Sequence, residues 1–271
     1  KLEKSGVSMN IASFLGAATT RILGVGYENR DATDSEMKKM KEIVTKSMEE
    51  GAMGIGSSLI YAPGDYASTE ELIELSKSAS EYGGMYISHL RSEGAKLLEA
   101  LDELITISRE ADIPAEIYHL KASREPNWPK LDEVISIVED ARAEGLQITA
   151  DIYTYNASST GLTGVIPTWV QEGGHDAWIK RMKDPSVRPR LLNDIREQLA
   201  EQPPEGILMV GFNTPEMSKK YLAKTVAEAA KMRGQSPEEA IIDMVIEDNH
   251  RIQCIYFSMS EENIRKKIQL P

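Results

Sequence analysis

Apolar stretches alternate with amphipathic segments along the first 153 residues of the chain. The apolar stretches have the length of strands, and the segments between them repeat apolar residues at helical spacing. The predicted strands cover 7–14, 52–61, 85–90, 115–120 and 147–153. The predicted helices cover 33–51, 68–84, 94–111 and 129–145. These units recur about every thirty residues, which is the βαβ pattern of a parallel sheet.

Capping residues mark the ends of two predicted helices. Thr33 or Asp34 can cap the first helix, and Gly51 ends it. Ser68 and Glu71 open the next helix with the spacing of a capping box. The pattern therefore predicts an α/β fold of the partial TIM-like (β/α) barrel type, with residues 1–153 as barrel units.

The alternation breaks after the strand that ends near Tyr153. Small polar residues, tryptophans and charged helical pieces follow, and the next predicted strand is 207–212. A helical pair at 221–247, a strand at 252–257 and a final helix complete the chain. We interpret 154–250 as a lid insertion with helices, and 251–271 as the return to the barrel, within one catalytic domain.

Composition narrows the choice of partners and compartment. The chain has 271 residues and a net charge of −12, with no cluster of basic residues, so we expect no nucleic-acid partner. No apolar stretch has the length of a membrane span, so we expect no membrane partner. Cys254 is the only cysteine, which excludes a disulfide within the chain and favours a cytoplasmic location. The first residue is Lys1 and the last segment is "KKIQLP", from which we expect the central part of a longer polypeptide.

Two of the four histidines occupy equivalent places in successive units. His89 lies in "YISHLRSE" and His119 in "EIYHLKAS", each where a predicted strand ends. Sites in parallel β/α folds gather at the carboxyl ends of strands, and two imidazoles from neighbouring strands can share one zinc ion. A single histidine there would more often be a hydrogen-bonded core residue, but the repeated placement favours metal ligation.

Other polar side chains follow the same strand ends. They are Ser57, Ser58, Tyr61, Arg91, Glu93, Lys121, Asp151, Tyr153, Tyr155, Ser158 and Ser159. A metal on one side of such a ring and a lysine with hydroxyls on the other would suit a small carboxylate substrate. Single members also have structural explanations, since Glu93 can be a helix N-terminal carboxylate and Arg91 its surface partner.

Five segments carry a resemblance to a known family. They are "GAMGIGSSLIYAPGDYASTEELIEL", "YISHLRSEG", "EIYHLKAS" followed by "NW", "TADIYTYNASSTGL" and "IYFSMSEENI". Together and in this order, they resemble the N-acyl-D-amino-acid deacylases (D-aminoacylases) of the amidohydrolase superfamily. The resemblance implies a zinc-dependent TIM-like barrel with a small β-sandwich. It also implies hydrolysis of an N-acyl-D-amino acid to a carboxylate and a D-amino acid.

The resemblance also implies roles for individual residues. His89 and His119 would be zinc ligands, and Tyr61 would donate to the oxygen of the scissile carbonyl. Lys121, Tyr153 and Ser159 would hold the α-carboxylate of the substrate. A tyrosine donor beside a metal suits the stabilisation of a developing oxyanion.

Several features of the family are absent from this sequence. The His-x-His pair of an early strand, the cysteine ligand in a "GNCG"-like context and the aspartate of an "SDG" segment do not occur. Cys254 lies in "IQCIYFSMS", so we interpret it as a core cysteine. "DIYTY" stands where "DQYPY" is commoner, which affects the placement of Tyr153 and Ser159. Both ends that form the sandwich are missing from this sequence.

Three alternatives to the deacylase remain open. A cyclic-amide amidohydrolase would use a carboxylated lysine, and "MGIGSSL" holds none. An aldolase acting through Lys121 would leave the paired histidines unexplained. A non-catalytic β/α body that binds a ligand or partner chains would need no complete zinc site, which two histidines alone do not provide. If the segment 161–169 lines a side-chain pocket, its lack of basic residues favours apolar D-amino acids.

Overall fold

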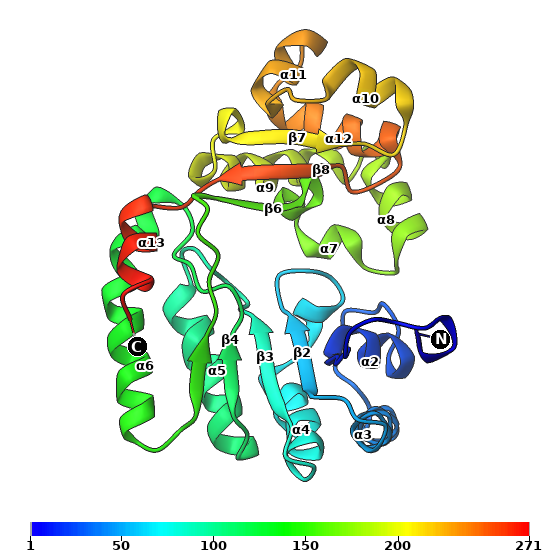
Figure 1. The fold of residues 1–271 in the computed structure, drawn as a ribbon. Coiled ribbons are helices and arrows are strands. Elements are labelled where there is room, and N and C mark those ends of the chain that lie inside the picture. The colour runs from blue at the N-terminus through cyan, green and yellow to red at the C-terminus, as the bar shows by residue number, and fades with distance from the viewer. Residues whose placement is uncertain (1, 271) are drawn as a thin grey trace.

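The computed structural model describes residues 2–270 and has two bodies, one above the other (Figure 1). The lower body is built on a five-stranded parallel sheet of order β1-β2-β3-β4-β5. Its strands are β1 (Leu15–Gly16), β2 (Gly54–Ser58), β3 (Met85–His89), β4 (Ala115–Ile117) and β5 (Ile148–Ala150). The strands point their carboxyl ends at the upper body. The predicted α/β class is confirmed.

Helices connect the parallel strands, as the apolar periodicity predicts. They are α2 (Ala17–Gly24), α3 (Asp34–Glu49), α4 (Thr69–Ser80), α5 (Leu97–Ala111) and α6 (Leu131–Ala143), after the short α1 (Leu2–Ser5). Thr33 forms a capping box with Glu36 at the start of α3, and Ser68 accepts a hydrogen bond from the Glu71 backbone at α4. Their apolar faces bury residues such as Leu101 against Ile55 and Tyr86 in one core.

The strand predicted at 7–14 is wrong. These residues form neither helix nor strand, and the sheet begins only at β1. The apolar side chains that suggested a strand are exposed, with Met9 70% accessible. An apolar run without a buried face does not specify a strand.

The upper body, which we call the lid, has a three-stranded antiparallel sheet of order β6-β8-β7. Its strands are β6 (Ala157–Gly161), β7 (Ile207–Gly211) and β8 (Gln253–Phe257). Its helices are α7 (Thr168–Gln171), α8 (His175–Met182), α9 (Arg188–Glu201), α10 (Pro215–Tyr221), α11 (Val226–Arg233) and α12 (Pro237–Asp248). Buried lid residues such as Met244 and Leu191 form a second core. Strand β8 lies between β6 and β7 in this sheet.

Short 3-10 helices and one returning helix complete the chain. The 3-10 helices are Gly64–Tyr66, Glu125–Lys130, Leu162–Val165 and Pro204–Gly206. The last helix, α13 (Glu261–Lys267), lies beside α6 of the lower body (Figure 1). Asn263 fixes it there by donating to the Trp128 carbonyl oxygen at 3.0 Å.

Hydrogen bonds join the lid to the loops that follow the parallel strands. The Tyr66 hydroxyl donates to the Thr168 carbonyl oxygen at 2.7 Å, and Arg124 pairs with Glu201 at 2.7 Å. The lid thus stands over the carboxyl ends of the sheet, where sites in parallel β/α folds lie.

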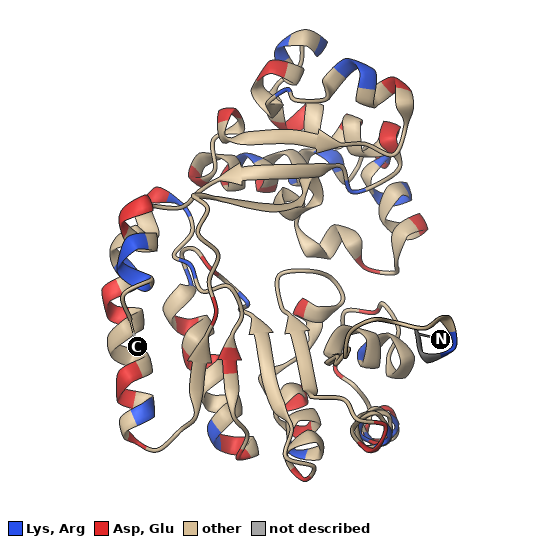
Figure 2. Cartoon of the chain, in the orientation of Figure 1, with Lys and Arg blue, Asp and Glu red and all other residues tan. Residues whose placement is uncertain are grey.

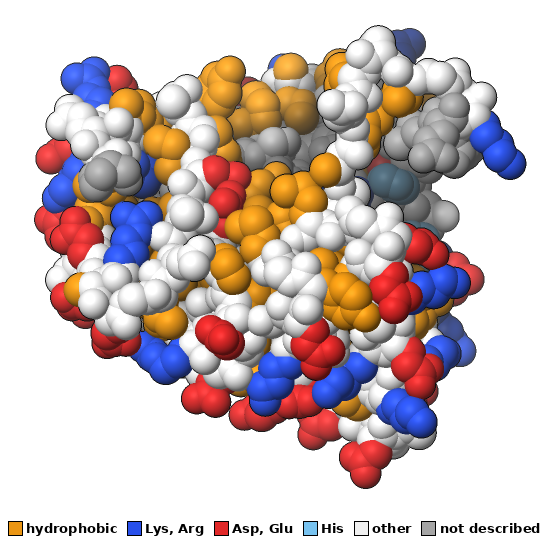
Figure 3. Space-filling view, turned by 60° about the horizontal axis from the view of Figure 1, so that its bottom comes forward, with side chains coloured by type: hydrophobic (Ala, Val, Ile, Leu, Met, Phe, Trp, Pro, Cys, Tyr) orange, Lys and Arg blue, Asp and Glu red, His pale blue; other side chains and the backbone are white. Residues whose placement is uncertain are grey.

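Charged residues of both signs are interspersed over the helices of both bodies (Figure 2). The face in Figure 3 likewise carries acidic and basic side chains side by side along its lower margin. None of the helices in the described part of the chain has the combined length and apolar character needed to cross a membrane.

Candidate metal centre

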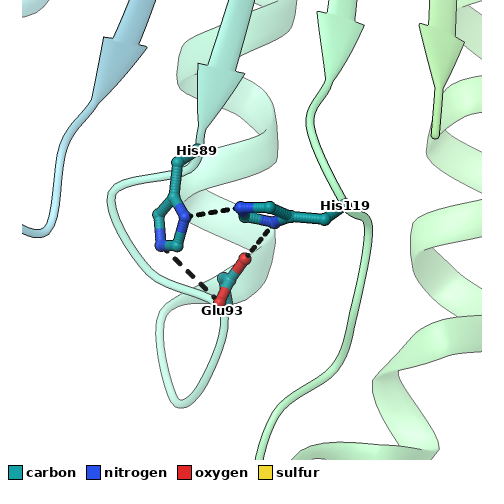
Figure 4. A group of neighbouring side chains, drawn as sticks. All are labelled: His89, Glu93 and His119. Carbon is teal, nitrogen blue, oxygen red and sulfur yellow. Dashed lines mark hydrogen bonds and ion pairs between the residues drawn. The ribbon is translucent and has the colours of Figure 1, made fainter. Parts of the chain in front are cut away.

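Two neighbouring strands bring the repeated histidines together. His89 is the last residue of β3, and His119 follows β4, which pairs with β3 in parallel through Ser88 and Ile117. Nδ1 of His89 lies 2.8 Å from Nε2 of His119, and the ring planes meet at 80°. Figure 4 shows the two imidazoles facing each other below the strand ends.

Glu93 completes the cluster from the loop between β3 and α5. Its Oε1 lies 3.1 Å from Nδ1 of His119, and its Oε2 lies 3.7 Å from Nε2 of His89 (Figure 4). The Lys121 ammonium lies 2.5 Å from Glu93 Oε1 and 2.6 Å from His119 Nδ1. Sequence reasoning assigned Glu93 no ligand role, although its position four residues after His89 was a usable signal.

The backbone of His119 is turned so that its ring reaches His89. Its φ is +44°, in the left-handed region that most side chains avoid. The Asp151 carboxylate, just past β5, accepts a hydrogen bond from the His119 backbone N–H, and the Asp151 carbonyl oxygen accepts from Leu120 at 2.9 Å. Asp151 therefore supports the conformation of His119 without touching the cluster's ring atoms.

Burial and neighbouring charges set the protonation of the cluster. Burial lowers the pKa of His89 to about 4, so its imidazole is neutral at neutral pH, as a metal ligand requires. Burial raises the pKa of Glu93, but the His119 hydrogen bond and the Lys121 charge outweigh it and lower this pKa to about 2. Glu93 therefore offers a metal an anionic oxygen ligand beside the imidazole nitrogens of His89 and His119.

These three side chains fit a divalent metal. One ligand atom from each of His89, Glu93 and His119 lies within 4.8 Å of the others. Nε2 of His89 is buried and has no hydrogen-bond partner among the described residues, which is costly unless something else binds it. Two imidazoles and one carboxylate form a known zinc ligand set that leaves a fourth position open.

The residues expected to bind substrate lie at different distances from this cluster. Tyr61 and His89 have ring centroids 5.8 Å apart, and Tyr153 and His119 have them 6.1 Å apart. The Lys121 ammonium lies 5.3 Å from the Tyr153 ring centroid. Ser159 lies on β6, is exposed, and pairs with Ile255 of β8. The structure gathers Tyr61, Lys121 and Tyr153 around the histidines, whereas it shows no contact between Ser159 and them.

Other candidates from the sequence have structural partners. Arg91 binds Glu103 at 2.8 Å and the carbonyl oxygens of Asp65 and Ala67, so it supports the loop after β2 and does not pair with Glu93. Ser57 hydrogen bonds to Tyr86 and Ser88 inside the sheet.

The lone cysteine and the segment 161–169 belong to the lid. Cys254 is fully buried in the lid core, as its interpretation as a core residue predicted. Leu162, Val165 and Ile166 are also buried in this core. The buried apolar side chains of 161–169 therefore stabilise the lid.

The fold and the cluster together define a class of protein, the parallel β/α proteins with candidate metal ligands at their strand ends. Hydrolases are common in this class. No protein-family model matches the chain. The chain is 35% identical over 161 residues to a D-aminoacylase of Alcaligenes xylosoxydans xylosoxydans. It is 30% identical over 159 residues to an N-acyl-D-glutamate deacylase of the same organism. Each match covers 59% of this chain and 33% of the relative, so the chain spans about a third of the length of these relatives.

Solved structures of deacylases are also similar to this chain. An N-acyl-D-glutamate deacylase from Bordetella bronchiseptica, complexed with zinc and a phosphonate inhibitor, matches with a TM-score of 0.78 at 22% identity. That match covers 100% of this chain and 48% of the other, and shows the likeness of fold. A D-aminoacylase with a binuclear metal centre matches with a TM-score of 0.75 at 27% identity, over 98% of this chain and 47% of the other. The resemblance to N-acyl-D-amino-acid deacylases is confirmed.

Proposed function

We propose that this chain carries the metal-binding and substrate-binding face of a zinc-dependent hydrolase of N-acyl-D-amino acids. The observation that carries the proposal is the cluster of His89, Glu93 and His119, with a buried imidazole nitrogen that lacks a hydrogen bond within the described part of the chain. The similarity to D-aminoacylases, and to a deacylase solved with zinc, supports the choice of metal and of substrate class.

The reaction adds water across an amide. The C–N bond breaks, the acyl carbon gains the hydroxyl of a carboxylic acid, and the nitrogen leaves as the amine of a D-amino acid. Zinc held by His89, His119 and Glu93 would supply a Lewis acid that polarises the carbonyl and lowers the pKa of water. Because the carbonyl oxygen gains negative charge, a fixed donor beside it lowers the barrier.

Tyr61 is the proposed donor to the carbonyl oxygen. Its ring stands beside His89, on the loop that follows β2. A phenol O–H can donate a hydrogen bond to a developing oxyanion. We therefore expect Tyr61→Phe to lower kcat.

Lys121, Tyr153 and Ser159 are the proposed partners of the substrate α-carboxylate. An ammonium has three N–H donors, and Lys121 directs one at Glu93, so donors remain for a carboxylate. Tyr153 stands beside this ammonium. The role of Ser159 is proposed from the resemblance alone, because its side chain lies on the opposite face of β6 from Thr160, which meets Tyr61.

Zinc binding and hydrolysis can be tested on the same set of proteins. We expect about one zinc per chain after dialysis against zinc, lost in His89→Ala and retained in His250→Ala. His250 is an exposed histidine of the lid and is the matched control. Zinc retained by His89→Ala, or lost equally in both variants, would contradict the proposed ligand set.

Hydrolysis is measured as release of free D-methionine or D-glutamate from their N-acetyl derivatives, with the L-enantiomers as controls. We expect release from the D-enantiomers only, abolished in His89→Ala. Zinc-loaded protein that releases no D-amino acid would overturn the deacylase function and leave a metal-binding β/α body. The ratio between the two substrates reports the side-chain preference.

The small-molecule substrate is the partner that we propose, and we propose a cytoplasmic location. The buried single cysteine and the mixed surface charge support this location.

A further inference from the structure

Strand β6 lies at the edge of the lid sheet that is nearest to the parallel sheet (Figure 1). Side chains alternate between the two faces of a strand, so Ser158 and Thr160 share one face and Ser159 lies on the other. Both hydroxyls of the shared face contact tyrosines of the candidate site. Tyr61 reaches Thr160 from the loop after β2, and Tyr153 reaches Ser158 from the end of β5.

Thr160 stands between Tyr61 and Arg251 in a row of three hydrogen-bonded side chains. The hydroxyl oxygens of Tyr61 and Thr160 lie 2.6 Å apart. Nη2 of Arg251, which precedes β8, donates to the same Thr160 oxygen at 3.3 Å. A guanidinium only donates, whereas a threonine hydroxyl can accept one hydrogen bond and donate another.

Either hydroxyl of the Tyr61–Thr160 pair can be the donor, and one of the two orientations directs the Tyr61 proton at the candidate site. In this orientation, Arg251 donates a hydrogen bond to Thr160, and the Thr160 hydroxyl donates one to the Tyr61 oxygen. Tyr61 then accepts from the lid side, and its own O–H is free to donate toward the space beside His89. A hydroxyl that accepts a hydrogen bond becomes a stronger donor.

We propose that Arg251 and Thr160 are positioning residues that orient the Tyr61 hydroxyl for donation at the metal centre. A strand of the lid thereby aligns a tyrosine that comes from a loop of the lower body. The consequence for catalysis rests on the proposed deacylase function, while the alignment itself does not.

Kinetics of the zinc-loaded protein test the catalytic consequence. Thr160→Val keeps the shape of the side chain and removes its hydroxyl, and it should lower kcat about tenfold with little change in KM. Thr160→Ser restores the hydroxyl and should recover most of the rate. Thr163→Val, at a nearby lid threonine whose hydroxyl has no hydrogen bond in the described structure, is the matched control and should leave kcat unchanged.

A double-mutant cycle separates positioning from general damage. If Thr160 acts through Tyr61, Thr160→Val should have no further effect on kcat in a Tyr61→Phe background. Equal rates for Thr160→Val and Thr163→Val, or independent effects of Thr160→Val and Tyr61→Phe, would overturn the positioning role.

The same cycle, measured by urea unfolding, needs no activity. A coupled Tyr61–Thr160 pair should give non-additive losses in the free energy of unfolding, and additive losses would overturn the proposed contact. Wild-type protein without deacylase activity would overturn the proposed function, and the unfolding cycle would still decide the alignment of Tyr61.

Discussion

His119 reaches His89 only because its backbone is left-handed, and Asp151 is the residue that stabilises this conformation. Loss of a group that holds a metal ligand in place typically changes metal affinity by about 10- to 100-fold. We expect Asp151→Ala to weaken zinc binding by about tenfold or more, although Asp151 is not itself a ligand. Competition with a chelator measures the affinity. The exposed Asp102→Ala is the control, and equal affinities in the two variants would show that Asp151 does not support the site.

Lys267 makes stability depend on pH. Its buried ammonium donates to the Leu120 carbonyl oxygen, and burial with repulsion from Lys121 lowers its pKa from 10.5 to about 8. Between these two values, the unfolded chain binds more protons than the folded chain. The contribution of Lys267 to the free energy of unfolding therefore rises with pH across this window.

A pair of variants isolates this contribution. We expect the difference in unfolding free energy between wild type and Lys267→Met to grow in favour of wild type from pH 8 to 10.5. Chemical denaturation at several pH values measures it. The exposed Lys46→Met should show a constant difference, and a constant difference for Lys267→Met as well would contradict the shifted pKa.

At the scale of the element, β2 and β3 approach each other at a glycine. Gly54 has a φ of +145°, and a Cβ built on it would lie 1.9 Å from the Met85 carbonyl oxygen. We expect Gly54→Ala to cost on the order of 3 kcal/mol of unfolding free energy, because backbone cannot move aside as a side chain can. Gly56→Ala in the same strand meets only ordinary contacts at 3.5 Å and should cost about 1 kcal/mol or less. Similar melting temperatures for both variants would contradict this.

The parallel strands and their helices were predictable because their signals are local. Apolar periodicity and caps such as Thr33 lie within each element. The role of β6 was not predictable, since its residues are small and polar and its partner is almost a hundred positions away, as in the pairing of Thr160 with Cys254. Strand 252–257 was predicted from its own apolar pattern, whereas its pairing with β6 has no local signal.

The residues of the candidate site also divide into those with a local sequence signal and those without one. His89 and His119 were predictable from their equivalent places at two strand ends. Glu93 had only its spacing of four residues from His89 as a signal, because its return to the histidines depends on the folded loop and on Lys121. Ser159 was placed with the substrate residues by resemblance, whereas the alternation of β6 puts Ser158 and Thr160 toward the tyrosines.

At the scale of the whole molecule, two separate cores predict two units of local stability. Met244 is fully buried in the lid core and Leu101 in the lower core. Met244→Ala should speed amide exchange across β6–β8 and the lid helices and leave α3–α6 protected, and Leu101→Ala should do the reverse. Hydrogen exchange followed by mass spectrometry measures both patterns. Loss of protection everywhere in either variant would mean that the molecule opens as one unit.

The chain crosses into the lid and back at neighbouring points, where the Met259 N–H donates to the Asn156 carbonyl oxygen at 3.2 Å. An insertion whose ends meet can be lengthened, shortened or exchanged by recombination with little disturbance to its host. Here the exchanged piece would bring its own hydroxyls to the two site tyrosines. A new lid would thus change the hydroxyl groups that meet Tyr61 in one genetic event, while His89 and His119 keep their places on the parallel sheet.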